Sequence, residues 1–150
     1  MGDTPRHLRA LQSLLASIDR DGYASAARSD QTEVLIRDVY PLERAFEILS
    51  NYTAELAKSA IAFLGQDPRD AVQNLRSLAD ERAVTRSRAE RLIGVHRTRN
   101  NLVHQYPDMR ARMLFEAAEI LERELGPFLR DLTSWFIGRL DRERSSGGSG

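Results

Sequence analysis

The chain has 150 residues, the usual length of one domain and enough to bury a single hydrophobic core. Its hydrophobic fraction of 41% and charged fraction of 29% are those of an ordinary globular protein. The absence of cysteine excludes disulfides, zinc sites built on thiolates and cysteine nucleophiles. No apolar stretch is long enough to span a membrane, and residues 1–5 lack the pattern of a signal peptide, so we expect a cytoplasmic protein that does not bind membranes.

The formal net charge is zero, but the charge is distributed unevenly along the chain. Residues 81–112 contain 8 arginines against 3 acidic residues, whereas the segments on either side carry an acidic excess. Concentrated positive charge favours a ligand that carries phosphate, since neutralised phosphates supply much of the affinity for nucleic acid. A solvated, arginine-rich helix face would give the same pattern, and on charge alone this simpler interpretation is preferred.

The first half of the chain predicts two helical regions, because its apolar residues recur at intervals of three and four. Thr4 as N-cap and proline at the next position predict a first helix over 5–18. Residues 19–30 are rich in Asp, Gly, Ser and Ala, so we expect a loop or an irregular connection. A long helical pattern follows over 31–64, and Pro41 predicts either a kink or the start of a new helix within it.

Gly65 predicts the end of that long helix, and three further helical stretches follow. The first opens at Asp67-Pro68 and ends near Asp80, the second covers about 85–104 and is ended by Pro107, and the third covers about 109–142, broken or bent at Gly126-Pro127. These elements predict a bundle of about five helices that forms one domain over residues 1–144. Residues 145–150, all Ser or Gly, are expected to form a flexible tail.

The end of the predicted fourth helix carries residue types suited to phosphodiester chemistry: Arg99-Asn100-Asn101-Leu102-Val103-His104-Gln105-Tyr106. Histidine as a residue type can both accept and donate a proton near neutral pH, which suits His104 to acid-base chemistry. The guanidinium of Arg99 stays charged and matches the geometry of phosphate oxygens, while Asn100 can orient the imidazole or the substrate. On RNA the ribose 2′-hydroxyl is an internal nucleophile, so we expect neither a metal nor another cofactor.

Helix geometry indicates which residues of this string can cooperate. Asn100 and His104 are four apart and share a face, whereas Arg99 and His104 are about 140° apart around an ideal helix. The length of the arginine side chain and the nearby helix end would let both groups reach one ligand. Leu102 and Val103 are expected to turn toward the core.

Each of these residues also has an ordinary structural interpretation. An arginine near a histidine on one helix is usually a surface contact, and a tyrosine at a helix end is commonly a half-buried aromatic. Two other histidines, His7 and His96, are assigned to structural or surface positions. The functional interpretation of the string therefore depends on the order and spacing of four residue types together.

The string Arg99-Asn100-x-x-x-His104-x-Tyr106 resembles the motif of HEPN domains, and specifically of HepT-type toxins. The segments 40–45 (Tyr-Pro-Leu-Glu-Arg-Ala) and 75–80 (Leu-Arg-Ser-Leu-Ala-Asp) are also similar to that family, and the resemblance covers about residues 31–140. It implies a homodimer in which two Arg-His motifs form one ribonuclease site acting on RNA. It also implies a cognate antitoxin, a minimal nucleotidyltransferase that blocks the toxin by adenylylating the motif tyrosine, here Tyr106.

Three hypotheses follow for the function. In the first, Arg99 binds phosphate and His104 is the acid-base catalyst of a metal-independent endoribonuclease toxin. In the second, the chain is a non-catalytic HEPN module that binds a nucleotide or nucleic acid. In the third, it is a structural helical partner protein, for which mutation of Arg99 would affect only stability.

Overall fold

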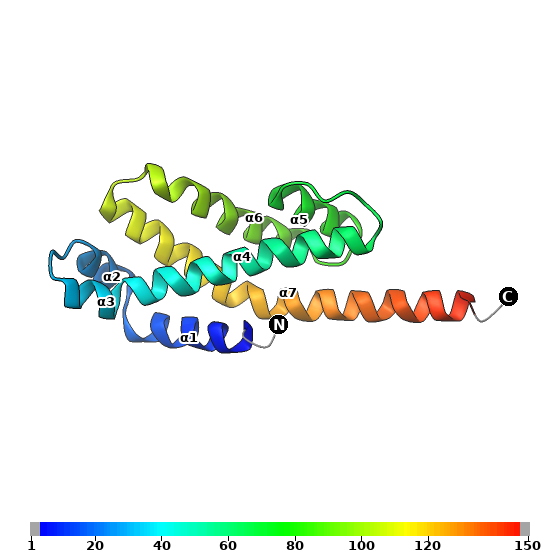
Figure 1. Cartoon of the computed structure of the whole chain (residues 1–150), viewed down its shortest axis with the longest axis horizontal. Helices are drawn as coiled ribbons and strands as arrows, with labels where there is room; N and C mark the ends of the chain where they lie inside the picture. The colour runs from blue at the N-terminus through cyan, green and yellow to red at the C-terminus, as the bar shows by residue number, and fades with distance from the viewer. Residues whose placement is uncertain (1–3, 148–150) are drawn as a thin grey trace.

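The computed structural model describes residues 4–147, and every regular element in that part of the chain is helical (Figure 1). The helices are α1 (Thr4–Ser17), α2 (Arg20–Ala27), α3 (Thr32–Asp38), α4 (Tyr40–Phe63), α5 (Ala71–Asp80), α6 (Arg86–Asn101) and α7 (Pro107–Gly147), with a 3₁₀ turn η1 (Leu102–His104) after α6. The predicted all-α class is confirmed. The predicted number of helices, about five, is too low, and the motif lies at the end of the sixth helix, not the fourth.

Helix α2 lies where a loop or irregular connection was expected. Asp19 is its N-cap, and the side chain of Asp19 accepts a hydrogen bond of 2.6 Å from the backbone N–H of Gly22. Tyr23 and its neighbour Ala24 are fully buried, and the ring of Tyr23 lies 5.7 Å from that of Phe115 in α7. An eight-residue helix is marginal alone, so packing on α7 supplies the stability that local sequence does not.

The long helical pattern is divided at Val39, and the proline at position 41 is the reason. Pro41 lies in the first turn of α4, where its missing N–H leaves no intrahelical hydrogen bond unmade. The other end of α4 is closed as predicted, because Gly65 adopts a φ of 78°. The N–H of Gln66 then donates to the carbonyl of Ile61 at 3.3 Å, which satisfies one of the last carbonyls of the helix.

The starts of the next two helices are set by N-cap side chains, and the first of them differs from the sequence-based expectation. The predicted start of the next helix at Asp67-Pro68 is too early: α5 begins at Ala71, because the side chain of Asp70 accepts a 2.8 Å hydrogen bond from the N–H of Gln73. Helix α6 is capped in the same way by Thr85, whose hydroxyl accepts from the N–H of Arg88 at 3.2 Å.

Helix α7 is continuous from Pro107 through Gly147, so it is bent but not broken. Figure 1 shows it changing direction near its middle, and Pro127 lies inside the helix, where it removes one intrahelical hydrogen bond. The helix includes residues 145–147, which the sequence analysis placed in the flexible tail. The remaining tail residues, 148–150, lie outside the described part of the chain.

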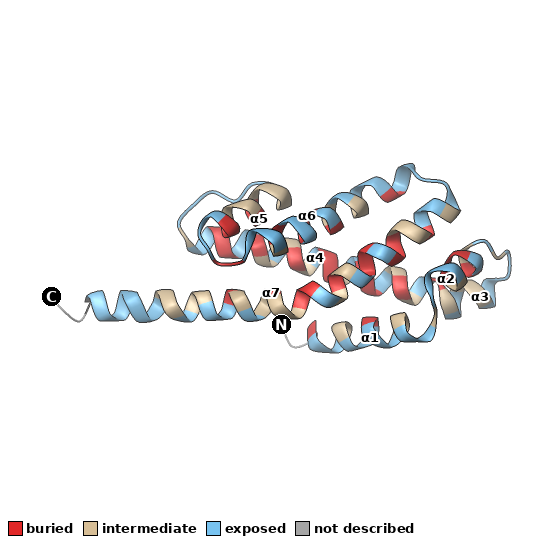
Figure 2. Ribbon diagram, turned by 180° about the vertical axis from the view of Figure 1, so that it is seen from behind, coloured by how far each residue is buried: buried red, intermediate tan, exposed pale blue. Residues whose placement is uncertain are grey.

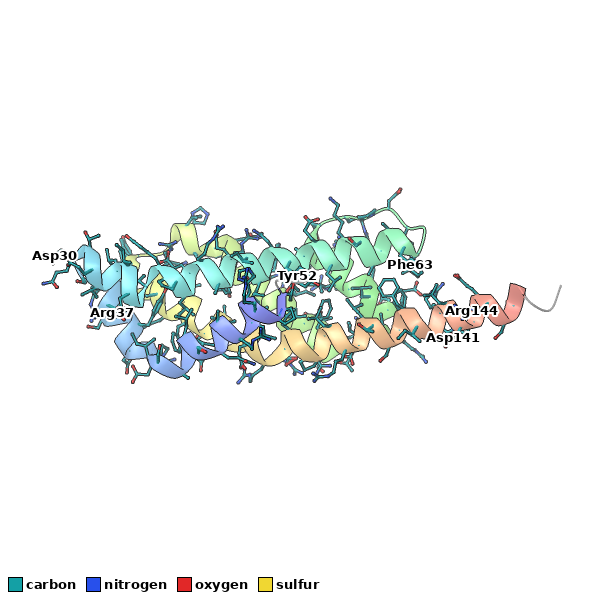
Figure 3. All side chains as sticks on the ribbon, turned by 60° about the horizontal axis from the view of Figure 1, so that its bottom comes forward. Asp30, Arg37, Tyr52, Phe63, Asp141 and Arg144 are labelled. Atoms are coloured by element: carbon teal, nitrogen blue, oxygen red, sulfur yellow. The ribbon has the colours of Figure 1, made fainter. Side chains whose placement is uncertain are left out.

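The hydrophobic core lies between α4, the first part of α7 and the helices packed on them. Figure 2 shows buried residues concentrated on α4 and on the first half of α7, whereas the last part of α7 is mostly exposed. The rings of Phe63 and Phe136 meet edge to face at 4.7 Å, where the end of α4 lies against α7. Beyond this contact α7 projects past the bundle and carries Asp141 and Arg144 (Figure 3). None of the helices within residues 4–147 combines the length and apolar character needed to span a membrane.

A network of ion pairs joins α6 to α7. The Nε of Arg88 donates to Glu124 at 2.9 Å, and its Nη1 donates to Asp131 at 2.6 Å. The other carboxylate oxygen of Glu124 lies 2.5 Å from Nε of Arg91. The side chain of Glu124 is only 10% exposed, so its charge depends on these two arginines for compensation.

Replacing Glu124 by alanine is expected to lower the free energy of unfolding by about 2 to 3 kcal/mol, since it leaves two partly buried guanidinium groups short of a partner. Chemical denaturation monitored by circular dichroism measures the change. Glu119→Ala, at an exposed position of the same helix, is the matched control and should change stability by less than about 0.5 kcal/mol. Equal effects of the two substitutions would contradict a structural role for the network.

Candidate functional site

The string from Arg99 to Tyr106 crosses three kinds of backbone structure. Helix α6 ends at Asn101, the 3₁₀ turn η1 occupies residues 102–104, and Gln105 is extended before α7 begins at Pro107. The predicted helix end at residue 104 is therefore late by three residues. Because the α-helical spacing stops before His104, the expected common face of Asn100 and His104 is not formed by regular α-helix.

The turn η1 anchors the string through one apolar side chain, not two. Leu102 is 5% exposed and packs in the core, as predicted. Val103 is 77% exposed, so the expectation that it also turns inward is wrong. In a 3₁₀ turn adjacent side chains are about 120° apart, so only one of the two can face the bundle. His104 is exposed, and Tyr106 is 86% exposed.

Arg99 lines a pocket of about 310 Å³ between α4, the end of α6 and the start of α7. Its walls are apolar side chains around a set of charged ones, and the residues are Tyr40, Glu43, Arg44, Phe46, Glu47, Arg99, Leu102, Val103, Arg110 and Leu114. His104, Asn100 and Tyr106 are not among them. A single chain therefore places the predicted phosphate-binding arginine in a pocket and leaves the predicted acid-base histidine outside it.

One carboxyl of this pocket, that of Glu43, is partly buried. Burial raises the pKa of the Glu43 carboxyl, the positive charge of Arg110 opposes that shift, and the negative charge of Glu47 adds to it. Burial also raises the pKa of the adjacent Tyr23, and the charge on Glu43 adds to the effect. In the sequence, Glu43 belongs only to a family-like segment and Arg110 to no motif, because the two come together only through the packing of α4 against α7.

His96 contacts the string directly, although it was assigned to a structural or surface position. Its Nε2 lies 3.3 Å from Nδ2 of Asn100, so a neutral His96 accepts a hydrogen bond from the amide. Burial lowers the pKa of His96, the charge of Arg99 lowers it further, and Asp70 opposes them. The pair was detectable in the sequence, because residues 96 and 100 are four apart on one helix.

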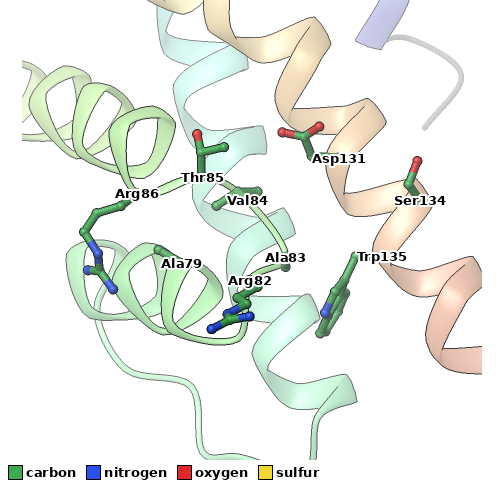
Figure 4. A pocket seen from close by; sticks show the side chains of 9 residues that line it. All are labelled: Ala79, Arg82, Ala83, Val84, Thr85, Arg86, Asp131, Ser134 and Trp135. Carbon is green, nitrogen blue, oxygen red and sulfur yellow. The ribbon is translucent and has the colours of Figure 1, made fainter.

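A larger cavity of about 590 Å³ lies at the other end of α6, about 24 Å away by the rise of a helix of this length. Figure 4 shows Asp131 and Trp135 reaching from α7 toward the segment 82–85, while Arg86 points away. It is lined by no histidine and by no residue of the string, so it is not the candidate site. Within residues 4–147 no group of three or more His, Asp or Glu side chains is arranged to hold a metal ion.

A family model described as "Ribonuclease HepT-like" matches residues 7–132. The chain belongs to this HepT-like family. The matched range contains the whole string, every residue that lines the 310 Å³ pocket and the ion-pair network between α6 and α7. Comparison with curated proteins and with solved structures gave no match. Membership confirms the predicted resemblance, and the coarse function it implies is that of a ribonuclease, with RNA as the substrate class.

The environment of His96 predicts how its pKa responds to substitution. Because Arg99 lowers that pKa, Arg99→Met is expected to raise it toward 6.5, whereas Asp70→Asn is expected to lower it further. The folded-state pKa lies below the unfolded value, so the contribution of neutral His96 to stability is complete above pH 6.5 and is lost as the pH falls below it.

NMR titration of the imidazole resonances between pH 4.5 and 8 measures these shifts. Arg97→Met is the matched control, because Arg97 is exposed on the same helix and does not perturb His96. An unchanged pKa of His96 in the Arg99 variant would contradict the effect of the Arg99 charge on the imidazole.

Proposed function

We propose that this HepT-like protein is a cytoplasmic toxin that cleaves RNA as a metal-independent endoribonuclease. The single observation that carries the proposal is the string Arg99-Asn100-x-x-x-His104-x-Tyr106 at the exposed end of α6 in a chain of this family. The exposure of His104 and Tyr106 supports it, since both side chains are accessible to a large substrate and to a modifying enzyme.

The proposed chemistry uses the ribose of the substrate as nucleophile. The 2′-oxygen attacks the adjacent phosphorus, the bond to the 5′-oxygen of the next nucleotide breaks, and the products are a 2′,3′-cyclic phosphate and a 5′-hydroxyl. A neutral imidazole of His104 accepts the proton of the 2′-hydroxyl, and an imidazolium donates a proton to the leaving oxygen. The guanidinium of Arg99 binds the phosphate oxygens and stabilises the charge that grows on them. Asn100, held by His96, orients these groups.

Two copies of the chain are proposed to share the site. In one chain Arg99 lines the pocket and His104 does not, so a second copy that places its own string opposite the first would complete the set of groups. Large apolar side chains at Val103, Tyr106 and Met109 are more than half exposed around the string. Clustered exposed apolar residues of this kind mark protein interfaces, and a homodimer contact here would cover them.

Adenylylation of Tyr106 is the proposed means of inhibition. The tyrosine is two residues from His104, and its side chain is 86% exposed. A transferred AMP group would add bulk and a negative charge beside the phosphate-binding arginine, which opposes binding of RNA. The proposed donor is ATP, used by a minimal nucleotidyltransferase antitoxin that forms a phosphodiester with the tyrosine hydroxyl and releases pyrophosphate.

Cleavage of RNA by wild type, Arg99→Ala and His104→Ala tests the catalytic proposal. With chelator present, wild type should generate 2′,3′-cyclic phosphate ends, and each variant should cleave at least about 100-fold more slowly. Arg97→Ala and His7→Ala are matched controls at positions outside the string and should retain activity. Equal cleavage by all proteins would contradict the assignment, and RNA binding without turnover would support the non-catalytic alternative.

Incubation with ATP and a minimal nucleotidyltransferase encoded beside this protein tests the regulatory proposal. Intact mass spectrometry should detect added AMP on wild type and none on Tyr106→Phe, because only the phenolic oxygen can accept the group. Tyr40→Phe is the matched control, since Tyr40 is a half-exposed tyrosine outside the string. If Tyr106→Phe gains the same mass as wild type, the acceptor is another residue.

A further inference from the structure

The pocket beside Arg99 contains charged side chains of both signs that form no ion pairs. Glu43, Arg44 and Glu47 come from α4, Arg99 from α6 and Arg110 from α7. Within residues 4–147 none of these five side chains takes part in a hydrogen bond or a close ion pair, although all line one pocket of about 310 Å³. Some other arginines of α6 and α7, such as Arg88 and Arg112, form ion pairs. Groups left unpaired around a pocket remain available to a ligand.

The combination of signs restricts the chemistry of that ligand. Three guanidinium groups suit a phosphate, but two carboxylates in the same pocket would repel a simple anion. A ligand with an anionic part and a separate part rich in hydrogen-bond donors can bind the guanidinium groups through the first part and the carboxylates through the second. A nucleotide is such a ligand, because its phosphate accepts hydrogen bonds and its base presents N–H donors.

The carboxylates discriminate among the four bases. An ionised carboxylate has two acceptor oxygens and no donor, so it binds best to two N–H groups that point the same way. The Watson–Crick edge of guanine presents N1–H and N2–H side by side, whereas the other three bases each present one such donor group on that edge.

We propose that this pocket is a base-binding subsite for guanine, in which Glu43 accepts hydrogen bonds from N1–H and N2–H and the arginines hold the adjacent phosphate. The half-exposed ring of Tyr40 at the rim provides a surface on which the base stacks. The position of Arg99 in the pocket wall joins this subsite to the reaction centre. The proposal rests on the ribonuclease function above and gives that site a preference for RNA cleaved next to guanosine.

The environment of Glu43 supports this assignment independently of the pocket's shape. Within residues 4–147 no donor lies within hydrogen-bond distance of its carboxylate, and burial raises the pKa of that carboxyl. Two N–H groups of a bound guanine would supply the missing hydrogen bonds. Binding of guanine would therefore relieve the unfavourable partial burial of an ionised carboxylate that lacks hydrogen bonds.

Calorimetric titration with the four nucleoside 3′-monophosphates tests the proposal on the wild-type protein. Guanosine 3′-monophosphate should bind about 10-fold or more tightly than the adenosine, cytidine and uridine compounds. Glu43→Gln, which keeps the size of the side chain but removes the pair of equivalent acceptors, should reduce that preference to within about twofold. Glu55→Gln is the matched control, because Glu55 is exposed on α4 and does not line the pocket.

Equal affinity for the four nucleotides, or a guanine preference that survives Glu43→Gln, overturns the proposal. Circular dichroism of the variant confirms that it is folded, so loss of binding is not loss of structure. A guanine preference in a protein that cleaves no RNA would support the subsite and overturn the nuclease function. Cleavage of RNA that depends on Arg99, without any base preference in binding, would support the nuclease function and overturn the guanine subsite.

Discussion

The attachment of α6 to α7 positions the segment from Arg99 to Tyr106. Glu124 is nearly buried and binds Arg88 and Arg91, which are one turn apart on α6, while Arg88 also binds Asp131. The side chains of Glu124 and Arg88 are only 10% and 21% exposed, so these two charges depend on their partners for compensation. An α-helix is a stiff element, and the rotation set near Arg88 is carried along about 17 Å of helix to Arg99. The ion pairs near Arg88, together with the buried apolar side chains of α6, therefore set the direction in which Arg99 points.

Much of the fold can be predicted from local sequence, and the predictions that are wrong have a common cause. Gly65 predicted the end of α4 correctly because a left-handed residue there is a local requirement. Helix α2 was missed because its stability depends on the burial of Tyr23 against Phe115, which is 92 residues later in the chain. The prediction that Val103 turns inward is wrong because it requires the helix to continue, whereas the chain changes to a 3₁₀ turn after Asn101. Tertiary packing and a change of helical type are not readable from periodicity.

Some residues of the candidate site can be predicted from the sequence and others cannot. Arg99, Asn100, His104 and Tyr106 are predictable because they form one ordered string in the sequence. Glu43 and Arg110 are not, because α4 and the start of α7 meet only in the folded protein.

Glu43 also affects how the stability of the protein depends on pH. Its folded-state pKa is raised, so the stability it confers is complete below its unfolded pKa of 4.5 and is lost as the pH rises through the folded-state value. At neutral pH the protein therefore tolerates a destabilising carboxylate in this pocket.

The short connection between α6 and α7 also affects how the chain loses entropy when it folds. Only residues 102–106 separate the two helices, so bringing them together closes a small loop at low entropic cost. The wall contributed by α4 is more than 50 residues away in sequence from Arg99, and docking it closes a much larger loop. An α6–α7 hairpin without α4 would present the arginine and histidine but lack Glu43 and the rest of the pocket. A partly folded chain of this kind would thus carry the string without the pocket beside Arg99.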